Sequence, residues 1–450
     1  MVAALLIAAP ASGQGKTTVA AGLARLHTRR GARVHCFKCA ADFIDPMWLQ
    51  AASGHPVHPL DLWMVGESEC ARRLAAAARA ADLVIVEGVM GLFDGQPSAA
   101  DLARRFGIPV LVVIDAAAMA GTFAAVAHGL RTWEPDLPWA GVLANGVAGA
   151  RHAAMLQAAL RESEAASWLG WLPREEALAL PERHLGLVMP TDTTDHLRVL
   201  DAAADALHDT VLGQRRAADW PAWTPPSPAP AEPAARWLQG RRIAVAHDAA
   251  FAFVYTANLD TLRSQGAPLR FFSPLAGDEL PPCDALWLPG GYPELHAAAL
   301  SSRHALRAQL HAHVREGKAL WAESGGMAVL ADELVDLHGQ SHALWGLLPG
   351  RVGVGHGLSA LGPRQWAVPD DIAAGAPATP LRGHSFHRWC FETPEKPRWR
   401  AQPVQPAAGS HEPVYERGSL RASGFHAWFA SSPRMTAWLF GAEGALRCTS

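Results

Sequence analysis

The sequence predicts an α/β protein of two domains, each built on a mainly parallel sheet. In the first half of the chain, short apolar runs alternate with amphipathic, alanine-rich segments, as in parallel strands joined by crossover helices, and a fresh α/β pattern begins in the second half. A proline-rich stretch at 217–240 separates the halves, because it can continue neither a helix nor a central strand. With 450 residues the chain exceeds one ordinary domain. We therefore expect domains at 1–216 and 241–450, joined by a linker.

The apolar runs place the strands, and the amphipathic runs between them place the helices. The strands expected in the first half are 2–8, 33–38, 82–87, 109–115 and 139–145. Helices between them include 16–29 and 151–162. A second α/β pattern begins at 242–246 and continues through 285–288 and 319–322. The chain contains no recognisable internal repeat.

Composition narrows the classes of partner. Apolar residues make up 50% of the chain and charged residues 18%, which favours large buried cores over disorder. A net charge of −3 offers no basic surface for nucleic acid or an anionic membrane. No apolar stretch reaches membrane-spanning length, and Met1 leads directly into a strand pattern rather than an export signal. We expect a cytoplasmic protein whose partners are small molecules.

The cysteines do not form a disulfide framework. Six are scattered along the chain, at 36, 39, 70, 283, 390 and 448, and we expect them to be thiols. Cys36 and Cys39 have the spacing of a metal-binding pair, but no second pair lies nearby in the sequence. We do not expect a metal there.

A glycine-rich segment at 12–18 predicts a nucleotide phosphate site. It follows the first strand and opens the first helix, where backbone N–H groups can face phosphates. Lys16 can reach the outer phosphates, and Thr17 can offer its hydroxyl to Mg²⁺. Pro10 stands where the general pattern has its first glycine. The candidate nucleotide-binding residues of the loop are Ser12, Gly13, Gly15, Lys16, Thr17 and Thr18.

Carboxylates follow the neighbouring strands. Glu87 ends the strand at 82–87 and is a candidate second Mg²⁺ ligand, or else it caps the next turn. Asp42 and Asp45 follow the second strand, at the edge where open parallel sheets bind ligands. They could hold Mg²⁺ or orient an attacking amine, or they could cap a helix start. The same alternatives apply to Asp94, one loop further along.

Taken together, the motifs resemble those of cobyrinate or hydrogenobyrinate a,c-diamide synthases, over nearly the whole chain. The segments that carry the resemblance are 12–17, 42–46, 87–95, Asn145, 249–255 and 289–294. The resemblance implies a P-loop parallel-sheet ATPase domain, like that of dethiobiotin synthetase. It also implies a flavodoxin-like class I glutamine amidotransferase domain.

The resemblance also implies a reaction. ATP, with Mg²⁺, phosphorylates a peripheral carboxylate of a corrin ring precursor, and ammonia from glutamine displaces the phosphate to leave an amide. Two acetate side chains, c and a, react in turn. The implied partners are a corrinoid, ATP, and glutamine or ammonia, and a homodimer is compatible with the family. The motifs do not choose between cobyrinic acid, metal-free hydrogenobyrinic acid and a nickel-bearing relative.

By motif match, five residues of the first half acquire roles. Asp42, Asp45 and Asp94 would serve metal, substrate or intermediate handling. Asn145 would help to hold the adenine. Lys38 is a weaker candidate for binding the substrate carboxylate or phosphates.

In the second half, the matched nucleophile is Ser324 and the matched base is His426. The family has cysteine at the first position, and a second histidine often found two residues after the base is Trp428 here. No acid follows His426 in the pattern of a triad, so we expect a dyad. The N–H groups of Gly291 and Gly325 would form an oxyanion hole.

Serine in place of cysteine puts glutamine hydrolysis in doubt. A thiol is readily held as a thiolate beside an imidazole, whereas a hydroxyl must lose its proton during attack. The serine could be a substitution made to silence the site, a native feature of an enzyme that takes free ammonia, or a working nucleophile. His384 and His387 lie in another segment resembling the family, where glutamate would stand at Ser385, and either histidine could be structural.

A nucleotide-dependent switch or scaffold is the alternative from another functional class. A switch needs phosphate and Mg²⁺ ligands, but no additional carboxylates facing a large substrate. The presence of Asp42, Asp45 and Asp94 therefore favours the amidating enzyme.

Overall fold

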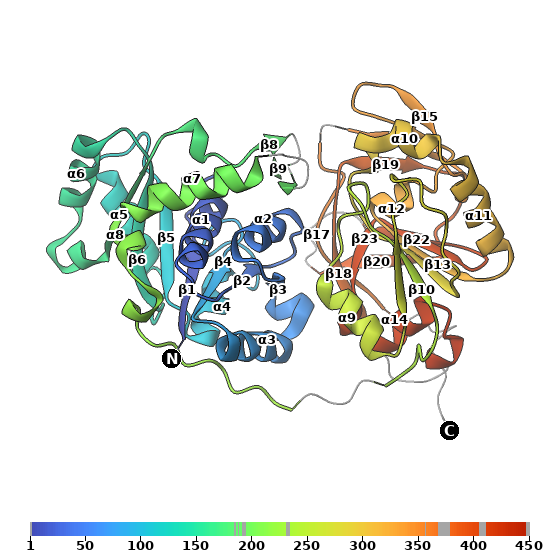
Figure 1. Cartoon of the computed structure of the whole chain (residues 1–450), viewed down its shortest axis with the longest axis horizontal. Helices are drawn as coiled ribbons and strands as arrows, with labels where there is room; N and C mark the ends of the chain where they lie inside the picture. Colours follow the sequence, from blue (N-terminus) through green and yellow to red (C-terminus); the bar gives the residue numbers. More distant parts are fainter. Residues whose placement is uncertain are drawn as a thin grey trace. The chain divides into compact units, whose positions relative to one another are not determined.

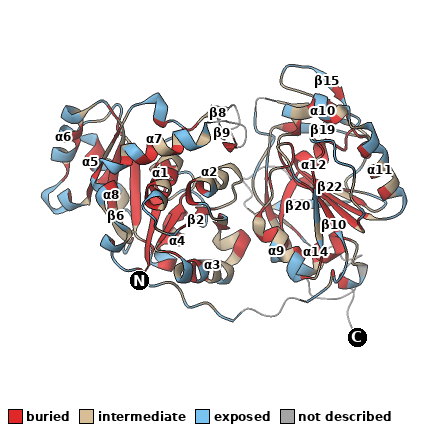
Figure 2. Ribbon diagram, in the orientation of Figure 1, coloured by how far each residue is buried: buried red, intermediate tan, exposed pale blue. Residues whose placement is uncertain are grey.

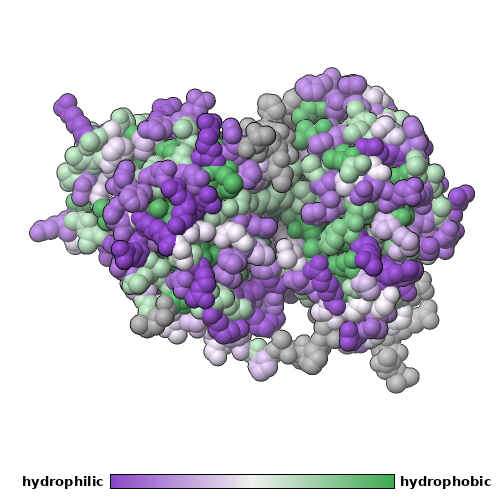
Figure 3. All heavy atoms as spheres, in the orientation of Figure 1, coloured by the Kyte–Doolittle hydropathy of each residue, from purple (hydrophilic) through white to green (hydrophobic). Residues whose placement is uncertain are grey.

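The computed structural model describes residues 2–183, 186–187, 189–190, 195–230, 235–355, 357–367, 379–404 and 411–446. The chain divides into two compact units, Met1–Pro230 and Ala231–Ser450, each an α/β structure (Figure 1). Red strands in Figure 2 mark the buried core of each unit, and polar residues cover much of the visible surface in Figure 3. The predicted α/β class is confirmed.

The first unit is built on one parallel sheet of seven strands. Their order is β3-β2-β4-β1-β5-β6-β7. The strands are β1 (Ala3–Ala8), β2 (Val34–Cys39), β3 (His58–Leu60), β4 (Leu83–Glu87), β5 (Val110–Asp115), β6 (Trp139–Val147) and β7 (Trp168–Pro173). The five predicted strands are confirmed within two residues at each end. The edge strand β3 was not predicted, because it has three residues and contains Pro59.

Helices connect the strands of this sheet. They are α1 (Lys16–Arg29), α2 (Ile44–Ser53), α3 (Glu67–Ala80), α4 (Ala99–Phe106), α5 (Thr122–Thr132), α6 (Ala150–Ala159) and α7 (His196–His208). The predicted helix at 16–29 is confirmed. The helix predicted at 151–162 ends earlier, because Leu160 adopts an extended backbone, and a 3-10 helix follows at Glu162–Ser167. Since all the strands run parallel, their carboxyl ends place the loops after β1, β2, β4 and β6 along one edge.

The second unit begins as a parallel sheet in the order β11-β10-β12-β13-β22, which is the flavodoxin-like order. Antiparallel strands then extend the sheet through β21, β20, β17, β18 and β23. The parallel strands are β10 (Ile243–Ala246), β11 (Leu269–Phe272), β12 (Ala285–Leu288), β13 (Ala319–Glu323) and β22 (Leu420–Ser423). The antiparallel strands are β17 (Ala360–Trp366), β18 (Leu381–His387), β20 (Trp399–Pro403), β21 (Glu412–Arg417) and β23 (Phe425–Trp428).

Smaller elements complete the second unit. A four-stranded sheet contains β14 (Glu333–Val335), β15 (Ser341–Ala343), β16 (Arg351–Val354) and β19 (Trp389–Glu392). The helices are α9 (Thr256–Ser264), α10 (Ala297–Ser301), α11 (His304–Arg315), α12 (Gly325–Ala328) and α14 (Pro433–Leu439). The three strands predicted in this half are confirmed as β10, β12 and β13.

Both described ends of the predicted linker at 217–240 are packed rather than free. Trp220 and Trp223 are buried, and the Trp223 indole donates a hydrogen bond to the Phe106 carbonyl at 2.8 Å. At the other end, Leu238 belongs to a core cluster of the second unit. The division between units, after Pro230, falls inside the predicted linker.

Two further sequence expectations concern cysteines and membranes. Cys36, Cys39, Cys70 and Cys283 are buried free thiols, Cys390 is an exposed one, and Cys448 lies outside the described residues. No helix within the described ranges is both long enough and apolar enough to cross a membrane.

Candidate functional site

The loop between β1 and α1 has the backbone that a phosphate site requires. Gly13 and Gly15 adopt positive φ angles of 75° and 91°, which glycine permits at little cost. Lys16 begins α1, and its Nζ donates to the carbonyls of Ala11 at 2.9 Å and Met90 at 2.7 Å. The lysine thus connects its own loop to the segment after β4. Ser12 and Thr18 lie in the same loop and helix start, as predicted from the sequence.

Thr17 and Glu87 meet at the ends of α1 and β4. The Thr17 hydroxyl donates to Glu87 Oε1 at 2.6 Å, and the Glu87 side chain is fully buried. Glu87 Oε2 is buried without a hydrogen-bond partner in the described part of the chain. Burial raises the pKa of the Glu87 carboxyl to about 7, although Lys38 opposes the rise. The turn-capping alternative is not what this geometry shows.

This arrangement fits a bound Mg²⁺. A hydroxyl beside an unsatisfied carboxylate oxygen offers two of the oxygen ligands that the ion prefers, and phosphate and water oxygens usually supply the others. No group of three or more His, Cys, Asp and Glu side chains among the described residues could hold a metal by itself. The protein would therefore hold the ion together with the nucleotide, through Thr17 and Glu87.

Lys38 is engaged with acidic side chains rather than facing an open space. Its Nζ lies 2.6 Å from Asp45 Oδ2 and 3.0 Å from Glu87 Oε1, and it also donates to the Gly88 carbonyl at 3.0 Å. Burial alone would lower the pKa of Lys38, but Asp45 and Glu87 more than offset this and raise it. In this structure Lys38 holds the two carboxylates together, and direct contact with substrate remains a prediction.

The carboxylates of Asp42 and Asp94 accept hydrogen bonds from backbone N–H groups close to them in the sequence. Asp42 Oδ1 accepts from the N–H groups of Ile44 at 2.8 Å and Asp45 at 3.0 Å, which is the helix-capping alternative that the sequence left open. Burial and the neighbouring Asp45 raise the pKa of Asp42 to about 7. Asp94 Oδ2 accepts from the Gly91 N–H at 2.7 Å. Metal or substrate roles for both residues stay predictions.

Asn145 lies against the phosphate loop. Its Nδ2 donates to the Gln14 carbonyl at 3.0 Å, and the Gln14 side chain accepts from the Asp115 N–H at 2.8 Å. These bonds tie the loop to β5 and β6. The predicted adenine contact is untested, and Gln14 was not anticipated as an anchor.

In the second unit, Ser324 forms a strained turn between β13 and α12. Its φ of 49° and ψ of −119° are unusual for a residue with a side chain, and this is the conformation of a nucleophile elbow. The Ser324 N–H donates to the Ser423 carbonyl at 2.8 Å, and its own carbonyl accepts from Met327 N at 2.9 Å. The residue is 3% exposed. The backbone is therefore prepared for a nucleophile.

The loop 289–294 packs against this elbow so closely that only glycine fits. A Cβ on Gly325 would lie 3.0 Å from Gly291 N and 2.8 Å from Gly291 O. A Cβ on Gly290 would lie 3.0 Å from Nδ1 of His426. Gly291 thus contacts the elbow, and the neighbouring Gly290 contacts the predicted base. An oxyanion hole from Gly291 and Gly325 remains a prediction that suits this contact.

His426 lies on β23 and is almost fully buried. Burial lowers the pKa of His426 well below its usual value, and the nearby His384 and His387 add to the effect. A neutral imidazole can accept a proton, as a general base must. His384 stacks on His426 with centroids 5.0 Å apart, so the structure brings this second histidine to the site. Trp428 is buried against Tyr255 instead.

Two buried carboxylates of this region were not predicted. Glu412 lies 3.3 Å from His387 Nε2, and His387 also stacks on Trp389. Glu323 directly precedes Ser324 and accepts hydrogen bonds from β23 and from Trp321. Adjacency to Ser324 was the available signal for Glu323, whereas nothing in the sequence pairs Glu412 with His387.

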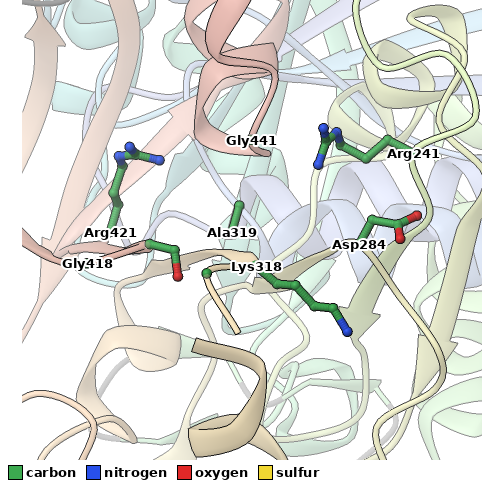
Figure 4. A pocket seen from close by; sticks show the side chains of 9 residues that line it. Arg241, Asp284, Lys318, Ala319, Gly418, Arg421 and Gly441 are labelled. Carbon is green, nitrogen blue, oxygen red and sulfur yellow. The ribbon is translucent and has the colours of Figure 1, made fainter. Parts of the chain in front are cut away.

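The hollow in Figure 4 lies at the opposite end of β13. Its volume is about 410 Å³, and it opens beside Ala319, at the start of the strand that Ser324 follows. Its charged groups are largely paired: Lys318 with Glu316, Arg421 with Glu416, and Asp284 with Arg242. It is not part of either candidate site.

The first unit combines a phosphate loop with nearby carboxylates, and the second unit has the features of a glutamine amidotransferase. This combination defines the class of amidoligases that receive ammonia from a glutaminase-type domain. Two family models match the chain. The CobQ/CobB/MinD/ParA nucleotide binding domain covers residues 5–188, and the CobB/CobQ-like glutamine amidotransferase domain covers 242–433. Each description agrees with the unit that it matches.

Full-length relatives define the family. The chain is 50% identical to hydrogenobyrinate a,c-diamide synthase of Stutzerimonas stutzeri, over 97% of this chain and 98% of the relative. It is 51% identical to the enzyme of the same name from Pseudomonas aeruginosa, over 97% of each chain. It is 47% identical to cobyrinate a,c-diamide synthase of Herminiimonas arsenicoxydans, over 98% of this chain and 97% of the relative. The chain belongs to the hydrogenobyrinate and cobyrinate a,c-diamide synthase family.

Proposed function

We propose that this protein amidates the a and c acetate carboxylates of a corrin ring acid in an ATP-dependent reaction of cobalamin biosynthesis. One observation carries the proposal. Thr17 and the buried Glu87 stand at the phosphate loop, and Asp42 and Asp45 lie close to them around Lys38. A site that only binds a nucleotide does not require the additional carboxylates of Asp42 and Asp45. The names of the full-length relatives supply the substrate class.

In the first step, a substrate carboxylate oxygen attacks the γ-phosphorus of ATP, the bond from phosphorus to the bridging oxygen breaks, and ADP leaves. Positioning and charge stabilisation dominate such a transfer. Lys16 would leave its carbonyl partners to contact the outer phosphates. When bound, Mg²⁺ neutralises phosphate charge, and Thr17 with Glu87 would hold it.

In the second step, ammonia attacks the acyl carbon, inorganic phosphate leaves, and the nitrogen loses a proton to give the amide. Asp42 and Asp45 are the candidates for orienting the amine or taking that proton. The positive charge of Lys38 lies between the carboxylates of Asp45 and Glu87 and reduces the repulsion between these two groups.

Ammonia can come from glutamine only if Ser324 attacks the carboxamide. The elbow supports a nucleophile, but a hydroxyl must be deprotonated during attack, and a site shaped for sulfur places the shorter side chain too far away. We therefore propose that this protein amidates with free ammonia far better than with glutamine. Homodimer formation and a cytoplasmic location remain predictions from the sequence.

The test is an amidation assay with the purified full-length protein. Mg-ATP is supplied with cobyrinic acid, hydrogenobyrinic acid or a nickel-bearing relative, and with ammonium or glutamine. Product mass and ADP release are followed together. We expect amidation of a corrin acid from ammonium, with one ADP per amide. Failure to amidate any of these acids from ammonium would overturn the proposed function.

A further inference from the structure

The sheet of the second unit brings two distant strands together near Ser324. In the order of the sheet, β22, β21, β20, β17 and β18 lie between β13, which leads into Ser324, and β23, which carries His426. In the chain, however, β23 follows β22 after Gly424 alone, and a side-chain hydrogen bond also joins β13 directly to β23. Glu323, the last residue of β13, accepts a hydrogen bond at Oε2 from the Ala427 N–H, 3.2 Å away. Ala427 is the residue after His426.

The link is buried and doubly supported. Glu323 is 2% exposed, and the same Oε2 accepts from the Trp321 indole at 3.1 Å. On the other side, the Ala427 carbonyl accepts from Asn258 Nδ2 of α9 at 2.7 Å. Both backbone polar groups of Ala427 are therefore held by buried side chains far away in sequence.

This link fixes the position of β23 relative to β13 after the chain has left β22 at Gly424. The shortest backbone route from Ser324 to His426 runs through the hydrogen bond from the Ser324 N–H to the Ser423 carbonyl and then along Gly424 and Phe425, so the backbone torsion angles of that short segment enter the separation. Through Glu323 and Ala427, one hydrogen bond joins the residue before the nucleophile to the residue after the base. Catalysis by a nucleophile and a base is sensitive to displacements of about 1 Å, which can cost on the order of a hundredfold in rate.

We propose that Glu323 is a positioning residue that sets the distance between the side chain at 324 and His426, by holding Ala427 through a buried acceptor oxygen. This inference rests on the nucleophile–base pair of the proposed function. Glu323 contacts neither ring nor hydroxyl in the described hydrogen bonds, so it acts through the backbone. The role requires an acceptor at Oε2 and does not require the negative charge.

Two variants separate the acceptor from the charge. Glu323→Gln keeps a carbonyl oxygen that can receive both hydrogen bonds, whereas Glu323→Leu leaves two buried donors without an acceptor. Because serine makes glutamine hydrolysis feeble, both are made together with Ser324→Cys. Glu416→Leu, on β21 of the same sheet, is the matched control, since it removes a carboxylate that is ion-paired with Arg421 rather than bonded to Ala427.

We would measure the release of glutamate from glutamine and the KM for glutamine. We would also measure how the alkylation of the introduced thiol by iodoacetamide depends on pH. With Glu323→Leu, we expect kcat to fall about a hundredfold and KM to change less than about threefold. The pH at which the thiol becomes reactive should rise, because the imidazole no longer assists. Glu323→Gln should stay within about fivefold of the parent, and Glu416→Leu should leave kcat unchanged.

Ammonium-dependent amidation in every variant reports on the synthetase reaction of the first unit, and thermal unfolding reports on whether the second unit is folded. Equal loss with Gln and Leu would assign the effect to charge and overturn the inference. Unchanged kcat and alkylation with Leu would also overturn it. If Ser324→Cys with Glu323 intact neither hydrolyses glutamine nor alkylates faster than a surface thiol, the nucleophile–base pair is wrong and the inference falls with it. The amidation assay would still decide the synthetase function separately.

Discussion

At the scale of single residues, Ser324 combines the backbone of a nucleophile with the side chain of a poor one. Its φ of 49° is costly for any residue other than glycine, and the protein keeps it although the thiol is absent. The buried imidazole of His426, whose pKa is lowered by burial, packs against Gly290 of the loop 289–294, and Gly291 of the same loop contacts the elbow. The backbone at Ser324 therefore has the geometry of a nucleophile elbow, although the side chain carries a hydroxyl instead of a thiol.

We expect Ser324→Cys to raise glutamine-dependent amidation by at least about a hundredfold and to leave the ammonium-dependent rate unchanged. A thiol is a much better nucleophile than a hydroxyl beside the same imidazole. Glutamate release and amide formation are measured in parallel. Ser302→Cys, at an exposed position, controls for the addition of a thiol. The prediction fails if the parent protein already uses glutamine as fast as ammonium and Ser324→Ala abolishes that activity.

Glu87→Gln should lower ammonium-dependent amidation by at least about a hundredfold and should weaken the dependence on Mg²⁺ concentration. The amide removes a charge from the pair that Thr17 and Glu87 offer to the ion. The rate is measured across a Mg²⁺ titration, with ammonium supplied so that nitrogen delivery does not limit it. Glu67→Gln, an exposed carboxylate paired with Arg105, should behave like the parent. An unchanged Mg²⁺ dependence for Glu87→Gln would exclude Glu87 as a ligand.

At the scale of elements, the elbow depends on β13, α12 and the loop 289–294 approaching without side chains between them. A Cβ on Gly326 would lie 2.6 Å from the Pro289 carbonyl oxygen, and the obstacle is backbone rather than a movable side chain. Gly353, on β16, has open space around the same position. The backbone therefore leaves no space for a side chain at Gly326, whereas Gly353 has such space.

Gly326→Ala should reduce the free energy of unfolding of the second unit by about 1–3 kcal/mol, because the added methyl group must displace backbone. Thermal unfolding measures the effect. Gly353→Ala is the matched control and should change stability by less than about 0.5 kcal/mol. Equal effects of the two substitutions would show that the close packing at the elbow is not the cause.

At the scale of the whole molecule, two units with separate cores share one chain. Among the described residues, a core cluster of the first unit lies within 3–220, and two core clusters of the second unit lie within 238–446. Two such cores need not unfold together. Nucleotide binding should therefore stabilise one unit by mass action without acting on the other.

We expect calorimetry to resolve two unfolding transitions, of which Mg-ADP raises only one. At a ligand concentration of about 100 times Kd, the stabilisation should be about 2.7 kcal/mol. Lys16→Ala should remove the shift, and Gly326→Ala should lower the other transition. A single transition that moves as a whole with nucleotide would show that the two units unfold as one cooperative body.

Much of the architecture was predictable because it depends on local patterns. The apolar runs at 2–8, 82–87 and 109–115 are short and predict buried strands, and the glycine loop before Lys16 predicts the start of a helix that faces phosphate. The antiparallel extension of the second sheet was not predicted. Its strands, such as β17 and β20, are half exposed and lack a strong apolar alternation.

The sequence by itself determined the two α/β units, the phosphate loop with Lys16 and Thr17, and the family to which the chain belongs. Motif spacing and hydrophobic periodicity are local properties of the sequence, and they can be recognised without knowledge of the tertiary packing. Only the tertiary structure decided that Lys38 is enclosed by Asp45 and Glu87, and that His384 stacks on His426. It also decided that Glu323 reaches Ala427. These contacts join residues up to 104 positions apart, and their existence depends on how the sheets twist and curl, which local sequence patterns do not encode.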